Sequence, residues 1–235
     1  MADPELLDDP VWQALTGPHR HFSVPAVRAA ALACRYRLDV APFAALHDIT
    51  DRRAWHDLAE LCGPDGRAAL EDVGPISVPA GWAVGNVFPV AQMIAPIHGL
   101  VADASPQPVV TLDKQDAPEM VALAELTRPG PFAASTVELG GYLGVRHEGR
   151  LIAMAGRRIH LPGWIEISAV CTHPDHRGRG LSRLLMTAVD AAIRAEGHRA
   201  FLHVLHENTS AIELYRRLGF TTRADMTITV VSPKG

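Results

Sequence analysis

A short segment rich in arginine and glycine is the part of this sequence best suited to bind an anion. It reads Arg177, Gly178, Arg179, Gly180, Leu181 and Ser182, and it directly precedes a long stretch of apolar periodicity. Glycine lets the backbone approach a ligand closely, a helix N-terminus adds a partial positive charge, and the two arginines add full ones. The pyrophosphate of a nucleotide-like cofactor is therefore the expected ligand.

Two better-known nucleotide-binding turns fit this segment less well. A P-loop ends in Gly-Lys-Ser or Gly-Lys-Thr, which is absent here, so an NTPase is not indicated. A dinucleotide-binding turn belongs to a parallel βαβ unit, whereas this segment comes late in a run of strands that predicts an antiparallel meander. A plainer alternative stays open, namely a tight turn with two solvated arginines.

Hydrophobic patterning predicts the elements that position this segment. Strands are expected at residues 109–112, 141–146, 151–159, 164–172, 201–205 and 226–230. Apolar residues at three- and four-residue spacing predict a helix over 181–193 that stops at Gly197, and capping boxes predict helices at 116–126 and 210–218. The order β-α-β-β-β-α-β-α-β indicates an α+β fold around one mostly antiparallel sheet.

The first hundred residues carry weaker signals. A helix is expected at residues 54–62 and an apolar strand at 90–94, and Pro75, Pro79, Pro89 and Pro96 are expected to divide the region into short pieces. Residues 102–108 (ADASPQP) are typical of a linker. The sequence thus predicts an N-terminal domain over 1–105 and a second domain over 109–235.

Composition argues against several classes of partner. The 22 Lys and Arg residues against 26 Asp and Glu give a net charge of -4, which disfavours nucleic acid and anionic membrane surfaces. The N-terminal stretch lacks the pattern of a signal peptide, and no run is apolar enough to span a bilayer. A cytoplasmic protein, monomeric or homodimeric, is expected.

No metal site or disulfide framework is expected from the cysteines and histidines. Cys34, Cys62 and Cys171 are odd in number and widely spaced. The pairs His173 with His176 and His203 with His206 lack a third ligand nearby on a clear helix.

Two motifs resemble the GNAT family of acetyltransferases. The family signature Arg/Gln-x-x-Gly-x-Gly/Ala follows a strand similar to Leu-Ala-Val-x-Pro, and here residues 170–174 (VCTHP) precede Arg177 to Ser182, with Ser182 in place of the final Gly or Ala. Residues 208–220 (NTSAIELYRRLGF) are similar to the family's Asn-x-x-Ala-x-x-x-Tyr-x-x-x-Gly-Phe. The resemblance covers residues 109–231 and implies a GNAT fold that uses acetyl-CoA.

The resemblance also implies the residues that bind acetyl-CoA. Backbone groups of the strand would pair with the pantetheine arm, main-chain N–H groups of the turn would hold the pyrophosphate, and an asparagine and a tyrosine would lie along the arm and near the sulfur. These residues are Val170, Cys171, Thr172, Arg177, Gly178, Arg179, Gly180, Leu181, Ser182, Arg183, Asn208 and Tyr215.

The chemistry implied by the resemblance is direct attack of a neutral amine on the thioester, which needs a base, an oxyanion donor and an acid. Tyr215 is the candidate acid and the Val170 N–H the candidate oxyanion donor. Glu166, which interrupts an apolar strand on the expected face of Val170, is a candidate base whose pKa burial would raise. His203 is the alternative base, and water could replace either.

Each of these catalytic candidates also has an ordinary structural explanation. Tyr215 lies on an apolar helical face, Glu166 fits an exposed or hydrogen-bonded strand carboxylate, His203 fits a satisfied imidazole on the sheet, and the Val170 N–H fits a ladder hydrogen bond.

Residues 126–132 and the strand at Trp164 resemble a bacterial branch related to glycine N-acyltransferases, in which a degenerate N-terminal half packs on the catalytic one. Residues 1–105 would then help to shape the acceptor site. The acceptor is expected to be a primary amine of a small molecule or a peptide. Two alternatives remain open: a non-catalytic acyl-CoA sensor with this fold, and a scaffold that uses its proline-rich N-terminal half.

Overall fold

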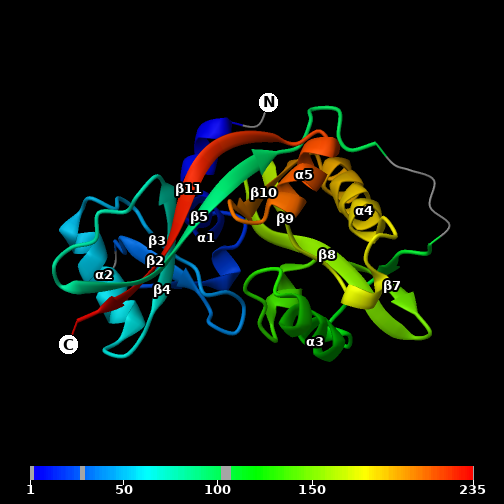
Figure 1. Ribbon diagram of the computed structural model, residues 1–235. Coiled ribbons are helices and arrows are strands. Elements are labelled where there is room, and N and C mark those ends of the chain that lie inside the picture. Colours follow the sequence, from blue (N-terminus) through cyan, green and yellow to red (C-terminus); the bar gives the residue numbers. More distant parts are fainter. Residues whose placement is uncertain (1–2, 27–29, 102–106, 235) are drawn as a thin grey trace.

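The computed structural model describes residues 3–26, 30–101 and 107–234, whose strands form two sheets. The larger sheet has eight strands in the order β4-β11-β5-β10-β9-β8-β7-β6, and the smaller has the order β1-β2-β3. Neighbouring strands of the larger sheet are antiparallel, except that β9 and β10 are parallel. This mostly antiparallel sheet flanked by helices confirms the predicted α+β class (Figure 1).

The elements after residue 109 follow the predicted order. They are β6 (Val110–Thr111), α3 (Ala117–Thr127), β7 (Leu143–His147), β8 (Arg150–Leu161), β9 (Trp164–Thr172), α4 (Leu181–Ala195), β10 (Arg199–Leu205), α5 (Thr209–Arg217) and β11 (Thr221–Pro233), with the 3-10 turns η3 (Thr136–Leu139) and η4 (Pro174–His176). The bounds of β9 match the prediction. Strand β11 is longer than predicted because it pairs with β5 on one side and β4 on the other.

Both predicted capping boxes are wrong. Asp116 makes no side-chain cap bond to α3, because its carboxylate and that of Glu119 pair with Arg146. Helix α5 begins one residue earlier than predicted, and its cap is Asn208, whose Oδ1 accepts the Ala211 N–H at 3.2 Å.

The first hundred residues contribute to both sheets. Their elements are η1 (Pro4–Asp8), α1 (Pro10–Thr16), η2 (Arg20–Phe22), β1 (Ser23–Pro25), β2 (Ala33–Tyr36), β3 (Ala44–Leu46), α2 (Arg52–Cys62), β4 (Ala68–Val73) and β5 (Trp82–Ile94). The expected break at Pro89 is wrong, since Pro89 lies inside β5. Pro89 is paired with Thr227 of β11, and its carbonyl accepts the His206 N–H at 3.1 Å, so the strand continues through the proline.

Strands from both sides of the expected linker share the larger sheet. Strand β5 lies between β11 and β10, and β4 lies on the far side of β11. Residues 102–106 of the expected linker lie outside the described residues, and the division into domains at 105–109 stays a prediction.

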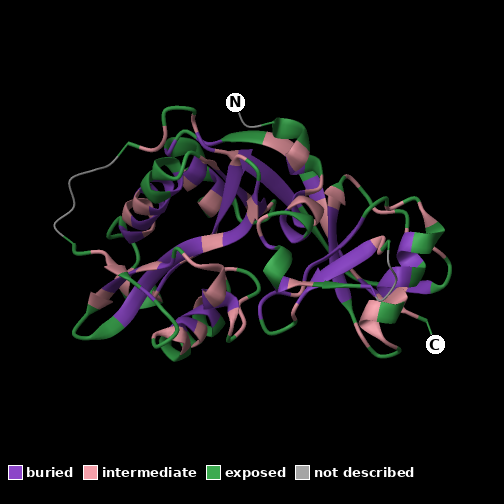
Figure 2. Cartoon of the chain, turned by 180° about the vertical axis from the view of Figure 1, so that it is seen from behind, coloured by how far each residue is buried: buried purple, intermediate pink, exposed green. Residues whose placement is uncertain are grey.

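Helices cover both faces of the larger sheet. Helix α4 packs on β8, β9 and β10, and the core beneath it also takes residues of α5. On the other face, α1 contacts β8 and α3 contacts β8 and β9, while α2 packs on the smaller sheet. Buried residues accordingly follow the strands and the inner sides of the helices (Figure 2). None of the helices in the described ranges combines the length and apolar character needed to cross a membrane.

Candidate active site

Strands β9 and β10 pair only where they begin. Their ladder joins residues 164–166 of β9 to residues 199–201 of β10. Farther along, β9 continues to pair with β8 and β10 with β5, but within the described ranges no ladder joins β9 to β10. The strands therefore separate before Val170, and from Ile167 onward no strand of the described ranges pairs with this edge of β9.

A bulge in β9 corrects the predicted placement of Glu166 and Val170. Ala169 has a φ of 54°, and the register with β8 shifts next to it. After the bulge, Val170 packs against the core under α4 together with Ile165 and Ile167, whereas Glu166 points to the opposite face. The expectation that Glu166 and Val170 share a face is wrong, because the extra residue reverses the alternation.

The glycine-rich turn ends as an open helix N-terminus. Gly178 and Gly180 have φ values of 75° and 74°, and a Cβ on either would meet nothing within 4 Å. Gly180 is the N-cap of α4. Because glycine has no side chain, the cap residue offers no acceptor to the N–H groups of the first turn. This backbone can bind an anion through its main-chain groups.

Three side chains hold this turn in place. Leu181 is buried in the core under α4. The Ser182 Oγ lies 3.2 Å from the Thr172 Oγ1, and the Arg177 Nε donates to the Thr172 carbonyl at 3.4 Å. The serine that departs from the family signature thus uses its hydroxyl to join α4 to the end of β9.

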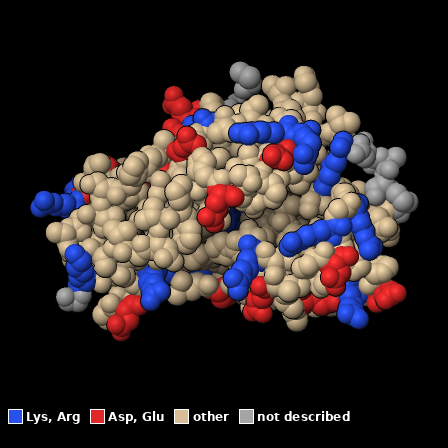
Figure 3. Space-filling model, in the orientation of Figure 1, with Lys and Arg blue, Asp and Glu red and all other residues tan. Residues whose placement is uncertain are grey.

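A cavity of about 550 Å³ passes through the gap between β9 and β10. Residues 167–170 and 203–205 of the two strands line it, as do residues 128–131, which follow α3. Ala211 and Tyr215 of α5 line it from the α4 side, whereas Phe43 and Ala69 line it from the core on the opposite face. The molecule is hollowed near the centre of the face shown in Figure 3.

Tyr215 and Asn208 reach this cavity from α5. Tyr215 is 9% exposed, and burial raises the pKa of its phenol to about 12, so it carries its proton at neutral pH. Asn208 is exposed and lines the cavity while it caps α5. The structure therefore brings both residues together with Val170, whereas the lining does not include the glycine-rich turn.

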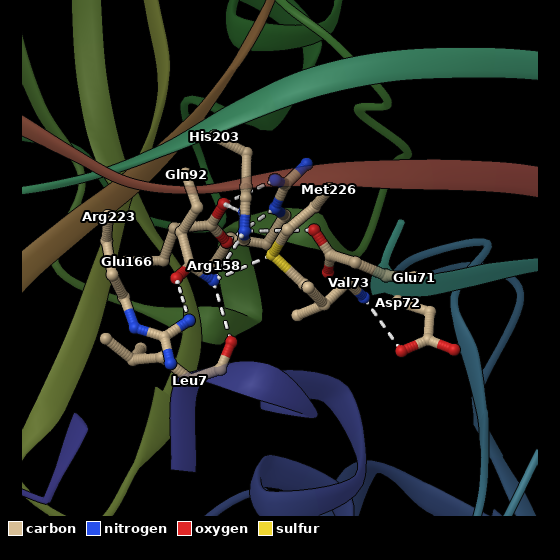
Figure 4. Close-up of polar contacts among 10 residues, drawn as sticks. All are labelled: Leu7, Glu71, Asp72, Val73, Gln92, Arg158, Glu166, His203, Arg223 and Met226. Carbon is tan, nitrogen blue, oxygen red and sulfur yellow. Dashed lines mark hydrogen bonds and ion pairs between the residues drawn. The ribbon is translucent and has the colours of Figure 1, made fainter. Parts of the chain in front are cut away.

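The two predicted bases, Glu166 and His203, belong to one buried network (Figure 4). Glu166 Oε2 accepts a hydrogen bond from the Arg158 Nε at 2.7 Å, and Glu166 Oε1 accepts one from the Arg158 Nη2. The same Oε1 lies 2.9 Å from the His203 Nδ1. The His203 Nε2 lies 3.0 Å from the Glu71 Oε1. The Glu71 and Glu166 side chains are 0% exposed and that of His203 is 2% exposed.

The expectation that burial raises the pKa of Glu166 is wrong. Burial opposes ionisation, but the charge of Arg158 and the hydrogen bonds from His203 and Arg158 outweigh it and lower the pKa to about 2. Burial likewise opposes protonation of His203, yet the carboxylates of Glu71 and Glu166 raise the pKa of its imidazole. Burial raises the pKa of Glu71, which His203 partly offsets. Glu166 is thus the counterion of Arg158 and a hydrogen-bond partner of His203.

Sequence reasoning missed Arg158 and Glu71. Arg158 stands next to Arg157 in β8, and Glu71 stands next to Asp72 in β4, so the local sequence does not distinguish each buried charge from its neighbour. Cys171, expected beside the pantetheine arm, is buried in the core under α3, and this burial raises the pKa of its thiol to about 11. Only the backbone groups of Cys171 can hydrogen-bond to a ligand in the gap between β9 and β10.

The histidine pairs do not converge on a shared site in the described part of the chain. His173 and His176 have ring centroids 5.8 Å apart, while His203 joins the buried network and His206 lies 3.2 Å from Asp225. The one described group of three possible metal ligands is His56, Asp57 and Glu60 on α2.

Comparisons with known proteins identify the family. Residues 142–229 match the family model described as FR47-like protein. A crystal structure of a putative acetyltransferase from the GNAT family of Novosphingobium aromaticivorans is 39% identical, covers 100% of both chains and has a TM-score of 0.87.

Two curated enzymes match parts of the chain. The N-alpha-acetyltransferase RimI of Mycobacterium tuberculosis is 33% identical over 133 residues, which are 52% of this chain and 82% of that protein. The mycothiol acetyltransferase of Saccharopolyspora erythraea is 37% identical over 82 residues, 34% of this chain and 27% of that protein. The chain belongs to the GNAT family and is an acyltransferase.

Proposed function

We propose that this chain transfers an acetyl group from acetyl-CoA to a primary amine, which attacks the thioester directly. The observation that carries the proposal is the cavity through the gap between β9 and β10, which both the bulge at Ala169 and the Tyr215 side chain line. One face of the sheet can thereby admit the acyl donor and the other the acceptor.

The residues present fit acetyl-CoA. The open space at Gly178 and Gly180 and the first-turn N–H groups of α4 suit a pyrophosphate, and the free edge of β9 from Ile167 to Thr172 suits the amides of a pantetheine arm. When bound, acetyl-CoA supplies the thioester carbonyl that the amine attacks. Asn208 lines the same gap from the start of α5.

Val170 and Tyr215 are the proposed catalytic groups. The Val170 N–H, next to the bulge, donates to the carbonyl oxygen as negative charge develops on it. The Tyr215 hydroxyl, protonated because burial raises its pKa to about 12, donates its proton to the leaving thiolate.

Water in the cavity is the proposed acceptor of the amine's proton. Both oxygens of Glu166 accept hydrogen bonds from Arg158 or His203, and both ring nitrogens of His203 face carboxylates, so neither residue is directed at an amine in the cavity. Arg67 and Arg128 also line the cavity, and their positive charge lowers the pKa of a nearby ammonium group, which favours the neutral nucleophile.

Tyr215→Phe is expected to lower kcat by about 10²-fold or more while the KM for acetyl-CoA stays within about threefold, because only the proton donor is removed. Since the pKa of Tyr215 is about 12, the wild-type rate should show no loss of this acid below about pH 10. The measurement is thiol release against pH. Tyr142→Phe, which removes a buried hydroxyl outside the cavity lining, is the control, and an equal loss of kcat in both variants would contradict the role of Tyr215.

An acetyl-CoA turnover screen over amine panels, read by released thiol, tests the proposed function. Transfer to a primary amine that depends on Tyr215 supports it. Tight CoA binding by calorimetry without turnover on any amine would instead indicate a non-catalytic acyl-CoA sensor.

A further inference from the structure

We propose that the acceptor is a primary amine that also carries a carboxylate, and that Arg67 and Arg128 hold this carboxylate at the exposed edge of the cavity. The inference rests on the proposed function and names the substrate class of the same site.

The charge on the cavity wall is one-sided. Arg67, Arg128 and Arg158 line the cavity, whereas no aspartate or glutamate is among its described lining residues. The charge of Arg158 is balanced by Glu166. Neither Arg67 nor Arg128 has a side-chain hydrogen bond or ion pair with any residue that the structure describes, so two positive charges remain available to a ligand.

The backbone at Arg128 places a long cationic side chain where a smaller residue is the usual choice. Arg128 follows α3 as its C-cap with a φ of 51° and a ψ of 56°, a left-handed conformation that favours Gly or Asn. Pro129, Gly130 and Pro131 follow it along the cavity, and the prolines restrict the loop. Strain of this kind is typical of ligand-binding positions, which fits a role for the guanidinium in binding.

A ligand whose only charged group is an ammonium would bind weakly to this cavity wall. Without a lining carboxylate, no side chain is available to pair with an ammonium group, and the arginines repel it. A carboxylate on the same molecule reverses this balance, because guanidinium groups bind carboxylates through paired, charge-assisted hydrogen bonds. The remaining wall at Phe43, Phe88, Val90 and Ile228 is apolar, so an amino acid with an apolar side chain fits best.

The position of the two arginines argues against a role in binding CoA phosphates. Arg67 precedes β4 in the first hundred residues, and the cavity lining contains no residue of the 177–183 turn.

The test compares three matched acceptors, phenylalanine, phenylalaninamide and phenethylamine, at saturating acetyl-CoA. In the wild type, kcat/KM for phenylalanine should exceed that of both others by at least about 10-fold, and up to about 100-fold, as expected for losing a charge-assisted hydrogen bond. In the double variant Arg67→Gln, Arg128→Gln, the kcat/KM for phenylalanine should lie within about threefold of the values for the other two acceptors. The double variant with lysine at both positions should recover part of the preference for phenylalanine. Arg20→Gln, which removes an exposed arginine outside the cavity lining, should leave the preference unchanged.

The KM for acetyl-CoA and the melting temperature are measured for the same variants. Both should stay near wild-type values. Equal use of the amino acid and its amide, or a rise in the KM for acetyl-CoA as the main effect of the arginine variants, would overturn the inference while leaving acetyl transfer established. Absence of transfer to every amine, with CoA still bound, would instead be the failure of the proposed function.

Discussion

Arg158→Met is expected to lower the free energy of unfolding by about 3–5 kcal/mol, because it leaves the Glu166 carboxylate buried without its main counterion. Arg158 donates two hydrogen bonds to Glu166, whose side chain is 0% exposed, and the charge of Arg158 is the chief influence that lowers the pKa of Glu166 against burial. The measurement is equilibrium urea unfolding followed by circular dichroism.

The neighbouring Arg157→Met provides the control. Arg157 pairs with Glu196 at 2.8 Å, but the Glu196 side chain is 49% exposed. Loss of this ion pair should therefore lower the free energy of unfolding by at most about 1 kcal/mol. Replacing Arg158 and Glu166 together by methionine should recover part of the loss, because no unpaired charge then remains between them. Equal destabilisation by Arg157→Met and Arg158→Met would contradict the importance of the buried pair.

Gly180→Val is expected to weaken acetyl-CoA binding by about 100-fold, which corresponds to about 3 kcal/mol. The φ of 74° at Gly180 sets the direction of the first-turn N–H groups of α4, and a branched side chain there would change this backbone and occupy the open space in front of it. Isothermal titration calorimetry with acetyl-CoA measures the effect.

Gly149→Val is the matched control for backbone strain. Gly149 has a φ of 80° and equal open space, but it lies in the turn between β7 and β8. Both variants should lose similar stability, about 1–2 kcal/mol, whereas only Gly180→Val should lose affinity for acetyl-CoA. Retention of full affinity by a folded Gly180→Val would contradict pyrophosphate binding at this turn.

Both parts of the chain contribute to the cavity and the groups around it. The glycine-rich turn, β9 and α5 come from residues after 109, while Phe43, Arg67, Ala69 and Val90 complete the cavity. The first hundred residues also supply Glu71 to the network around His203. We therefore expect acceptor selection to respond to changes in this part of the chain.

Local sequence patterns determined the elements of the second half and the place of the glycine-rich turn. The alternation around Trp164 to Thr172 and the helical spacing from Leu181 onward depend only on which face of each element is apolar, and the turn lies between them in sequence. The α+β class and the family resemblance followed from these features.

Only the tertiary structure decided the partners of the charged residues. Glu71, Arg158, Glu166 and His203 meet because the registers of β4, β8, β9 and β10 bring them together, and no local pattern contains that information. The bulge at Ala169 reversed the expected face of Val170, and the parallel strands separated after Glu166 to open the cavity. Periodicity specifies which face of an element is buried, whereas register and strand order specify what that face contacts, and these depend on contacts between residues far apart in the chain.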